Sequence, residues 1–166
     1  MAEPTLTPSK LWKRMTPAQR LQAARAFWRD EQAGDDQMQA VLLIAQQKKF
    51  RPKSVLALEE DRKARHLASL VSLPDTVAAR ALVTYHLVEQ RPMMAAFLDA
   101  LGVAHDNGVI QEEAVAPDPE KFNSAAELLA EQYPPDSVSL YLNTLFCQDP
   151  NTWGALADLP QRRDPG

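Results

Sequence analysis

The sequence predicts an all-α fold: one domain of eight or nine short helices packed as an irregular bundle. Nearly all of its 13 prolines fall between segments whose apolar residues recur every three or four positions. Proline lacks a backbone N–H and fixes φ, so helix interiors exclude it while the first helical turn accepts it. The 5 glycines are too few for a turn-rich β protein. The prolines therefore indicate where helices begin.

The N-terminal part carries the clearest helix start. We expect residues 1–9 to be flexible and residues 9–15 to form a short helical turn. Thr16 precedes a proline and stands three residues before Gln19, the spacing of a capping box. A helix is therefore predicted over residues 17–32, with one apolar face and a basic face opposite.

The second long helix is predicted to be central to the fold. Asp35 and Asp36 open it, where negative charge suits the helix dipole. Residues 41–45 are apolar on every side, which is typical of a helix surrounded by others. Pro52 then interrupts the pattern.

Five more helices are expected, each with an apolar stripe at helical spacing. A second capping-box pattern, Ser124 with Glu127, marks the start of one of them. These helices are expected from residue 54 or 59 to 72, over 75–90, over 92–101, from 124 onward, and over 138–146, with a last short helix around Trp153 and Leu156.

One segment departs from the helical pattern. Asn107-Gly108 is a strong turn signal within residues 103–110, where a small hairpin is possible. This hairpin and a loop up to residue 118 form an irregular insert. The helical domain is expected to cover residues 10–159, followed by a flexible tail over residues 160–166.

The charge is divided unevenly along the chain. Residues 1–65 hold 13 Lys/Arg and 8 Asp/Glu, a balance of +5, and the rest hold 5 and 14, a balance of −9. Three explanations stay open. The basic residues form a surface for an anionic partner, or the basic first helices pack beside the acidic second half or face water, or the chain self-associates head to tail. If a partner binds, the candidates are Arg25, Arg29, Trp12, Lys13 and Arg14.

Nucleic acid is a less expected partner. Trp12 within the basic stretch could stack on a base. However, the sequence pI is near 5.4, and no recognition-helix pattern follows the basic residues. Steeply salt-dependent binding would support this alternative.

The histidines raise one catalytic alternative. His105-Asp106, with an upstream His66 or His86 and a later Asp118 or Asp136, has the ligand order of an HD-type metal-dependent phosphohydrolase. In such a site the metal activates water for attack on a phosphoryl group. The turn residues that directly follow the pair argue against a metal site, and we infer no membership of that family.

Other motifs of reaction chemistry are missing from the sequence. It has no P-loop, no Gly-x-Ser-x-Gly elbow, no CxxC and no EF-hand loop, so no cofactor is expected. A single Cys147 and the lack of an apolar leader favour a cytoplasmic location, and no membrane partner is expected. The leading hypothesis is a non-catalytic helical protein-interaction or scaffolding protein.

Overall fold

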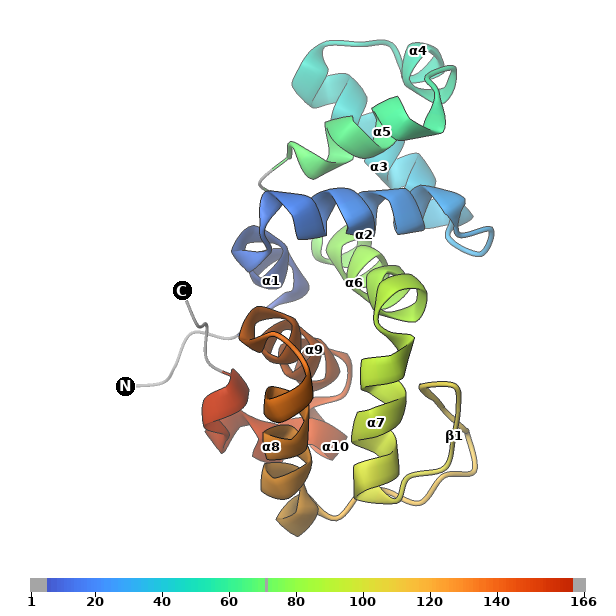
Figure 1. The fold of residues 1–166 in the computed structure, drawn as a ribbon. Helices are drawn as coiled ribbons and strands as arrows, with labels where there is room; N and C mark the ends of the chain where they lie inside the picture. The colour runs from blue at the N-terminus through green and yellow to red at the C-terminus, as the bar shows by residue number, and fades with distance from the viewer. Residues whose placement is uncertain (1–5, 71, 163–166) are drawn as a thin grey trace. The chain divides into compact units, whose positions relative to one another are not determined.

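The computed structural model describes residues 6–70 and 72–162, and it confirms the all-α class (Figure 1). Within these ranges the chain forms ten α-helices, three short 3-10 helices and one hairpin of two-residue strands. The count exceeds the expected eight or nine because the stretch after Pro52 forms two helices. No helix in the described ranges is long and apolar enough to cross a bilayer.

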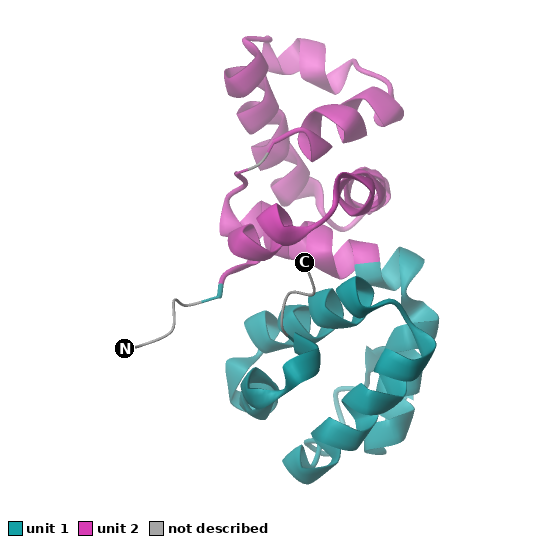
Figure 2. Ribbon diagram, turned by 60° about the vertical axis from the view of Figure 1, so that its left-hand side comes forward, with its two compact units in different colours: residues 1–6, 86–166 teal, residues 7–85 magenta. Residues whose placement is uncertain are grey.

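The chain divides into two compact units (Figure 2). Unit 2 comprises residues 7–85, and unit 1 comprises residues 1–6 and 86–166. The boundary lies inside the range 10–159 for which the sequence predicted one domain. Unit 2 contains α1 (Pro8–Arg14), α2 (Pro17–Arg29), α3 (Gly34–Lys48), α4 (Pro52–Leu56), α5 (Glu60–Ala68) and most of α6 (Asp75–Glu89).

The first helices of unit 2 begin where capping chemistry allows. The Thr16 hydroxyl accepts from the Gln19 N–H at 3.1 Å, and the Gln19 side chain accepts from the Thr16 N–H at 2.9 Å, which confirms the capping box. The Thr7 hydroxyl likewise accepts from the Lys10 N–H, so α1 starts at Pro8, within the segment expected to be flexible. Residues 1–5 lie outside the described residues.

The prediction that the second long helix is central was wrong. Within α3, Val41, Ile44 and Ala45 are buried, whereas Leu42 is 53% exposed and Met38 is 48% exposed. These two exposed residues are four apart and share one face, which no part of unit 2 covers. The main packing of unit 2 instead joins α2 to α5, two helices that are not adjacent in sequence.

Unit 1 is organised around α9. Nine successive residues of this helix, 137–145, are buried. Aromatic rings extend its core, because Phe97 packs edge-on against Tyr141 and Trp153 stacks on Phe122 at 5.6 Å. After the end of α6, the unit comprises α7 (Arg91–Leu101), β1 (His105–Asp106), β2 (Val109–Ile110), η1 (Pro119–Lys121), α8 (Phe122–Gln132), α9 (Pro135–Gln148), α10 (Pro150–Trp153), η2 (Gly154–Asp158) and η3 (Pro160–Arg162).

Two further expectations for unit 1 need correction. Helix α8 starts at Phe122, before the proposed cap, and the Ser124 hydroxyl donates to the Lys121 carbonyl instead of capping the helix. Residues 160–162, expected in a flexible tail, form η3 against α9. The Arg162 carbonyl accepts from the Ser139 hydroxyl at 2.7 Å and from the Asn143 amide at 2.8 Å. Residues 163–166 lie outside the described residues.

The predicted hairpin is confirmed. His105 pairs with Ile110, and Asp106 pairs with Val109, around the two-residue turn. Asn107 and Gly108 have φ values of 49° and 92°, as a type I′ turn requires. A side chain at Gly108 would also collide with α7, because an added Cβ would lie 2.9 Å from the Cβ of Met94.

Candidate functional site

The two arginines proposed for partner binding are engaged inside unit 2. Arg25 Nη2 lies 3.0 Å from Asp61 Oδ1, and Arg29 Nε lies 2.7 Å from Glu60 Oε1, so both pairs join α2 to α5. Asp61 also pairs with Arg65 at 3.1 Å. Both acids belong to residues 1–65, so these two arginines are neutralised within the basic part of the chain and not by its acidic second half.

Of the remaining N-terminal candidates for partner binding, one is buried and two are exposed. Trp12 is fully buried, and its indole N–H donates to the Leu70 carbonyl at 2.7 Å, so it cannot stack on a base. Lys13 and Arg14 are exposed at the end of α1. Of the five candidates, only these two are left as exposed cations without an ion pair among the described residues.

The three histidines do not build a metal site. Across residues 6–70 and 72–162, no group of three or more His, Cys, Asp or Glu side chains is placed to hold a metal ion. His66 belongs to α5 of unit 2, whereas His86 is buried in unit 1 with its ring 5.5 Å from that of Tyr141. Asp118 caps η1 by accepting from the Glu120 N–H.

His105 instead fastens the hairpin. Its Nδ1 accepts from the Gly108 N–H at 3.0 Å, and its Nε2 lies 2.6 Å from Asp99 Oδ1 of α7. Both ring nitrogens are thus occupied, which leaves no lone pair for a metal. Arg91 of α7 donates to the Asn107 carbonyl and so holds the turn from the other side. Asp106, the other half of the pair, is exposed.

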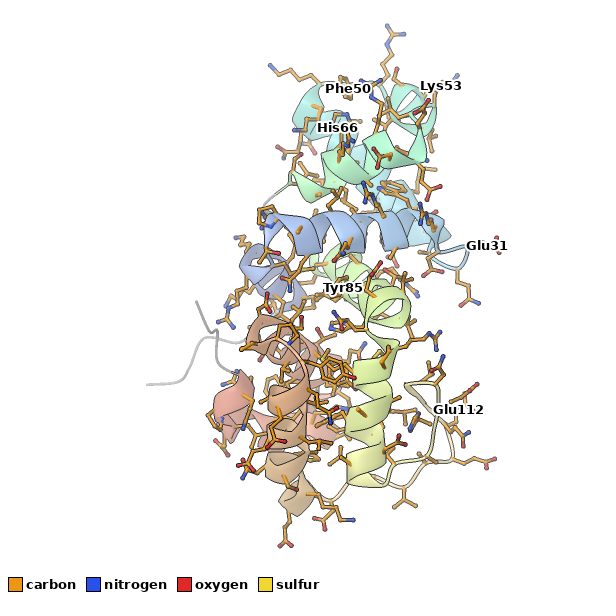
Figure 3. All side chains as sticks on the ribbon, viewed as in Figure 1. Glu31, Phe50, Lys53, His66, Tyr85 and Glu112 are labelled. Atoms are coloured by element: carbon orange, nitrogen blue, oxygen red, sulfur yellow. The ribbon has the colours of Figure 1, made fainter. Side chains whose placement is uncertain are left out.

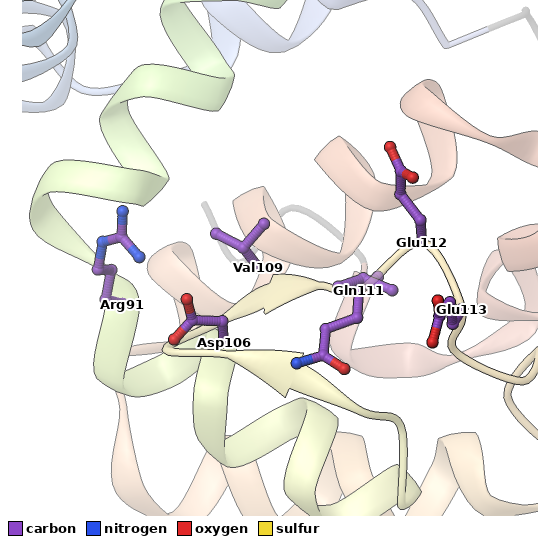
Figure 4. A pocket seen from close by; sticks show the side chains of 7 residues that line it. Arg91, Asp106, Val109, Gln111, Glu112 and Glu113 are labelled. Atoms are coloured by element: carbon purple, nitrogen blue, oxygen red, sulfur yellow. The ribbon is translucent and has the colours of Figure 1, made fainter.

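A shallow hollow of about 600 Å³ lies beside this hairpin (Figure 4). Arg91 from α7 and Asp106 from β1 line one part of it, and Glu112 and Glu113 follow β2. The remaining lining residues are Val109, Ile110 and Gln111. This set contains no Ser, Cys or His, so it offers carboxylates for binding but no nucleophile with a base.

The strongest free positive charge lies elsewhere, where α3 meets α4. We use the name cationic end for the exposed residues Lys48, Lys49, Phe50, Arg51, Lys53 and Leu56. No carboxylate in the described part of the chain pairs with any of its four cations. Phe50 and Leu56 are 42% and 49% exposed. This surface therefore combines unneutralised charge with apolar side chains.

His66 lies beside the cationic end. Its ring packs edge-on against Phe50 at 5.5 Å, and Figure 3 shows both side chains at the same end of unit 2 as Lys53. Partial burial, with the nearby charges of Lys48 and then Arg62, lowers the pKa of His66 below its ordinary value. A positive potential that disfavours another proton also favours an anion.

Sequence reasoning overlooked this surface. The basic stretch that drew attention runs from Lys10 to Arg29, although Lys48-Lys49-Phe50-Arg51-Pro52-Lys53 has four cations in six positions and no acid. The density of charge around a proline-marked helix break was the available signal. Loops on a rigid scaffold often carry function.

The chain was compared with known protein families, curated proteins and solved structures. No protein-family model, no curated protein and no solved structure matches the chain.

Proposed function

We propose that the protein is a non-catalytic helical interaction protein, and that its cationic end binds a protein partner with acidic and apolar side chains. One observation carries the proposal: Lys48, Lys49, Arg51 and Lys53 have no ion-pair partner among the described residues and surround exposed Phe50. Unneutralised charge steers an opposite charge toward the surface. Exposed aromatic and aliphatic groups supply the area that stabilises the complex.

The apolar side chains favour protein over nucleic acid as the partner. Phe50 could stack on a base, but Leu56 adds exposed aliphatic surface to the cationic end, and Met38 and Leu42 are exposed along α3. Phosphates and sugars offer no apolar surface for these aliphatic side chains to contact. The apolar face of an amphipathic helix offers such a surface. Nucleic-acid binding is therefore one outcome of the test below.

Fluorescence anisotropy with three labelled probes tests the proposal. The probes are a helical peptide with glutamates on one face and leucines on the other, polyglutamate, and single-stranded oligothymidine. We expect the amphipathic peptide to bind at least about tenfold more tightly than polyglutamate, a difference of about 1.4 kcal/mol. Equal or tighter binding of oligothymidine would contradict a protein partner.

A matched pair of variants locates the binding surface. Arg51→Glu/Lys53→Glu reverses two charges of the cationic end, and Lys13→Glu/Arg14→Glu makes the same change on α1 of the same unit. We expect the first variant to lose at least about tenfold in peptide affinity and the second less than about twofold. The reverse order would assign binding to α1 and overturn the proposal. Circular dichroism and thermal unfolding check that both variants fold.

A further inference from the structure

Large exposed hydrophobic side chains gather in two places. Eight are present among the described residues, and seven of them lie either in residues 38–56, from α3 to α4, or in residues 109–115. The first group is Met38, Leu42, Phe50 and Leu56, and the second is Val109, Ile110 and Val115. Scattered exposed hydrophobic residues are ordinary, but clustering of this kind marks interaction surfaces.

The two groups carry opposite charge. We use the name acidic loop for the exposed residues Asp106, Val109, Ile110, Glu112, Glu113 and Val115. Its three carboxylates face the hollow beside the hairpin, where Arg91 is the one lining cation. No basic side chain in the described ranges forms an ion pair with these carboxylates. Both surfaces therefore expose apolar side chains, and the negative charge of the acidic loop is complementary to the positive charge of the cationic end.

We propose that the cationic end of one copy of the chain binds the acidic loop of a second copy, head to tail. The hollow of about 600 Å³ accommodates a long basic side chain such as Arg51 or Lys53 between the carboxylates. Val109 and Ile110 then lie against Phe50 and its apolar neighbours. The inference rests on the proposed function, because it names the partner of the same surface.

The geometry sets the strength and form of this association. About six residues on each side are fewer than the 20–30 of a standard interface, so the contact is weak and sensitive to salt. The two surfaces differ, so two copies that make the contact reciprocally close a two-fold dimer, and copies that make it in one direction form rings or open chains.

Analytical ultracentrifugation of the full chain at low salt tests the inference. We expect the weight-average mass to rise above 18.5 kDa with protein concentration and to return to it in about 1 M salt, where the screening length is about 3 Å. A monomer at every concentration at low salt would overturn head-to-tail association.

Charge reversal on each side identifies the surfaces. Arg51→Glu/Lys53→Glu and Glu112→Lys/Glu113→Lys should each weaken self-association at least about tenfold. Combining the four substitutions exchanges the charges and should restore it. Glu127→Lys/Glu131→Lys on α8 is the matched control and should associate as the wild type does. Association that persists in Glu112→Lys/Glu113→Lys excludes the acidic loop as the partner surface.

The outcomes separate this inference from the proposed function. A chain that stays monomeric but still binds the amphipathic peptide through Arg51 and Lys53 keeps the proposed function and loses the inference. A chain that neither self-associates nor binds the peptide loses both.

Discussion

Two basic stretches of unit 2 have similar composition but differ in whether carboxylates neutralise them. Arg25 and Arg29 on α2 form ion pairs with Asp61 and Glu60 of α5, so their charges are neutralised within the unit. The four cations of the cationic end have no such partner in the described part of the chain. The difference teaches that a basic run keeps its charge available for a partner only where the fold brings no carboxylate to it.

The aromatic residues of the two stretches differ in the same way. Trp12 has no exposed surface and donates its N–H inside the unit, whereas Phe50 is 42% exposed beside uncompensated charge. An aromatic ring within a basic run thus serves packing in one place and is available for contact in the other. Four experiments probe this contrast, beginning with the largest expected effect.

Truncation of Trp12 should reduce stability strongly. Trp12→Ala removes a fully buried ring and is expected to lower the free energy of unfolding by about 3–5 kcal/mol, measured by urea denaturation. Trp12→Phe keeps most of the volume but leaves the Leu70 carbonyl unpaired, and should cost about 1–3 kcal/mol. Peptide binding by Trp12→Phe should remain at the wild-type level. If Trp12→Phe folds stably but does not bind the peptide, Trp12 takes part in binding, which would contradict this expectation.

Removing the acids of α5 should leave the basic residues of α2 without ion-pair partners, as those of the cationic end already are in the described part of the chain. Glu60→Gln/Asp61→Asn leaves Arg25 and Arg29 without their partners, so the acidic amphipathic peptide should bind a few-fold more tightly. The stability loss should stay below about 1 kcal/mol for each pair, because these side chains are largely exposed.

The control for this variant is Glu31→Gln/Asp35→Asn, which removes the same charge from unit 2 away from α5. If both variants gain the same affinity, the effect is net charge alone and the ion pairs do not mask the arginines. Anisotropy at low salt and urea denaturation give the two readouts.

The smallest effect concerns pH and His66. Since burial, Lys48 and Arg62 lower the pKa of His66 in the folded state, the unfolded chain takes up the proton first as pH falls below about 6.5. The free energy of unfolding therefore falls as the pH drops from about 6.5 to the lowered pKa of the folded state. Above about pH 6.5, His66 causes no pH dependence of stability. His66→Gln should remove this part of the dependence, measured by urea denaturation at pH values on both sides of the window.

The same group also reports binding. A bound acidic peptide offsets the charges of Lys48 and Arg62, so it should raise the pKa of His66, measured by NMR titration of its ring protons. The same titration of His66 with oligothymidine in place of the peptide is the comparison. An unchanged His66 titration in the peptide complex would place the bound peptide away from the cationic end.

The sequence predicted those features that depend on neighbouring residues. Thr16 with Gln19 forms its capping box, and Asn107-Gly108 closes its hairpin, because each signal acts within four residues. Ser124 with Glu127 had the same spacing and failed, because α8 already begins at Phe122. A local pattern thus identifies a helix more safely than its first residue.

The candidate site was less accessible to sequence reasoning. Arg25 and Asp61 are 36 residues apart, and nothing in either local pattern shows that they pair. The exposure of Leu42 and the burial of nine successive residues in α9 likewise depend on which faces other helices cover.

By itself, then, the sequence determined a helical chain with its breaks, caps and turn, since hydrogen bonds and φ preferences of those elements act over a few residues. Only the tertiary structure decided which helix is buried, that His105 supports a turn, and which cations of unit 2 stay free. Burial and charge neutralisation depend on distances between remote parts of the chain, and those distances exist only once the chain has folded.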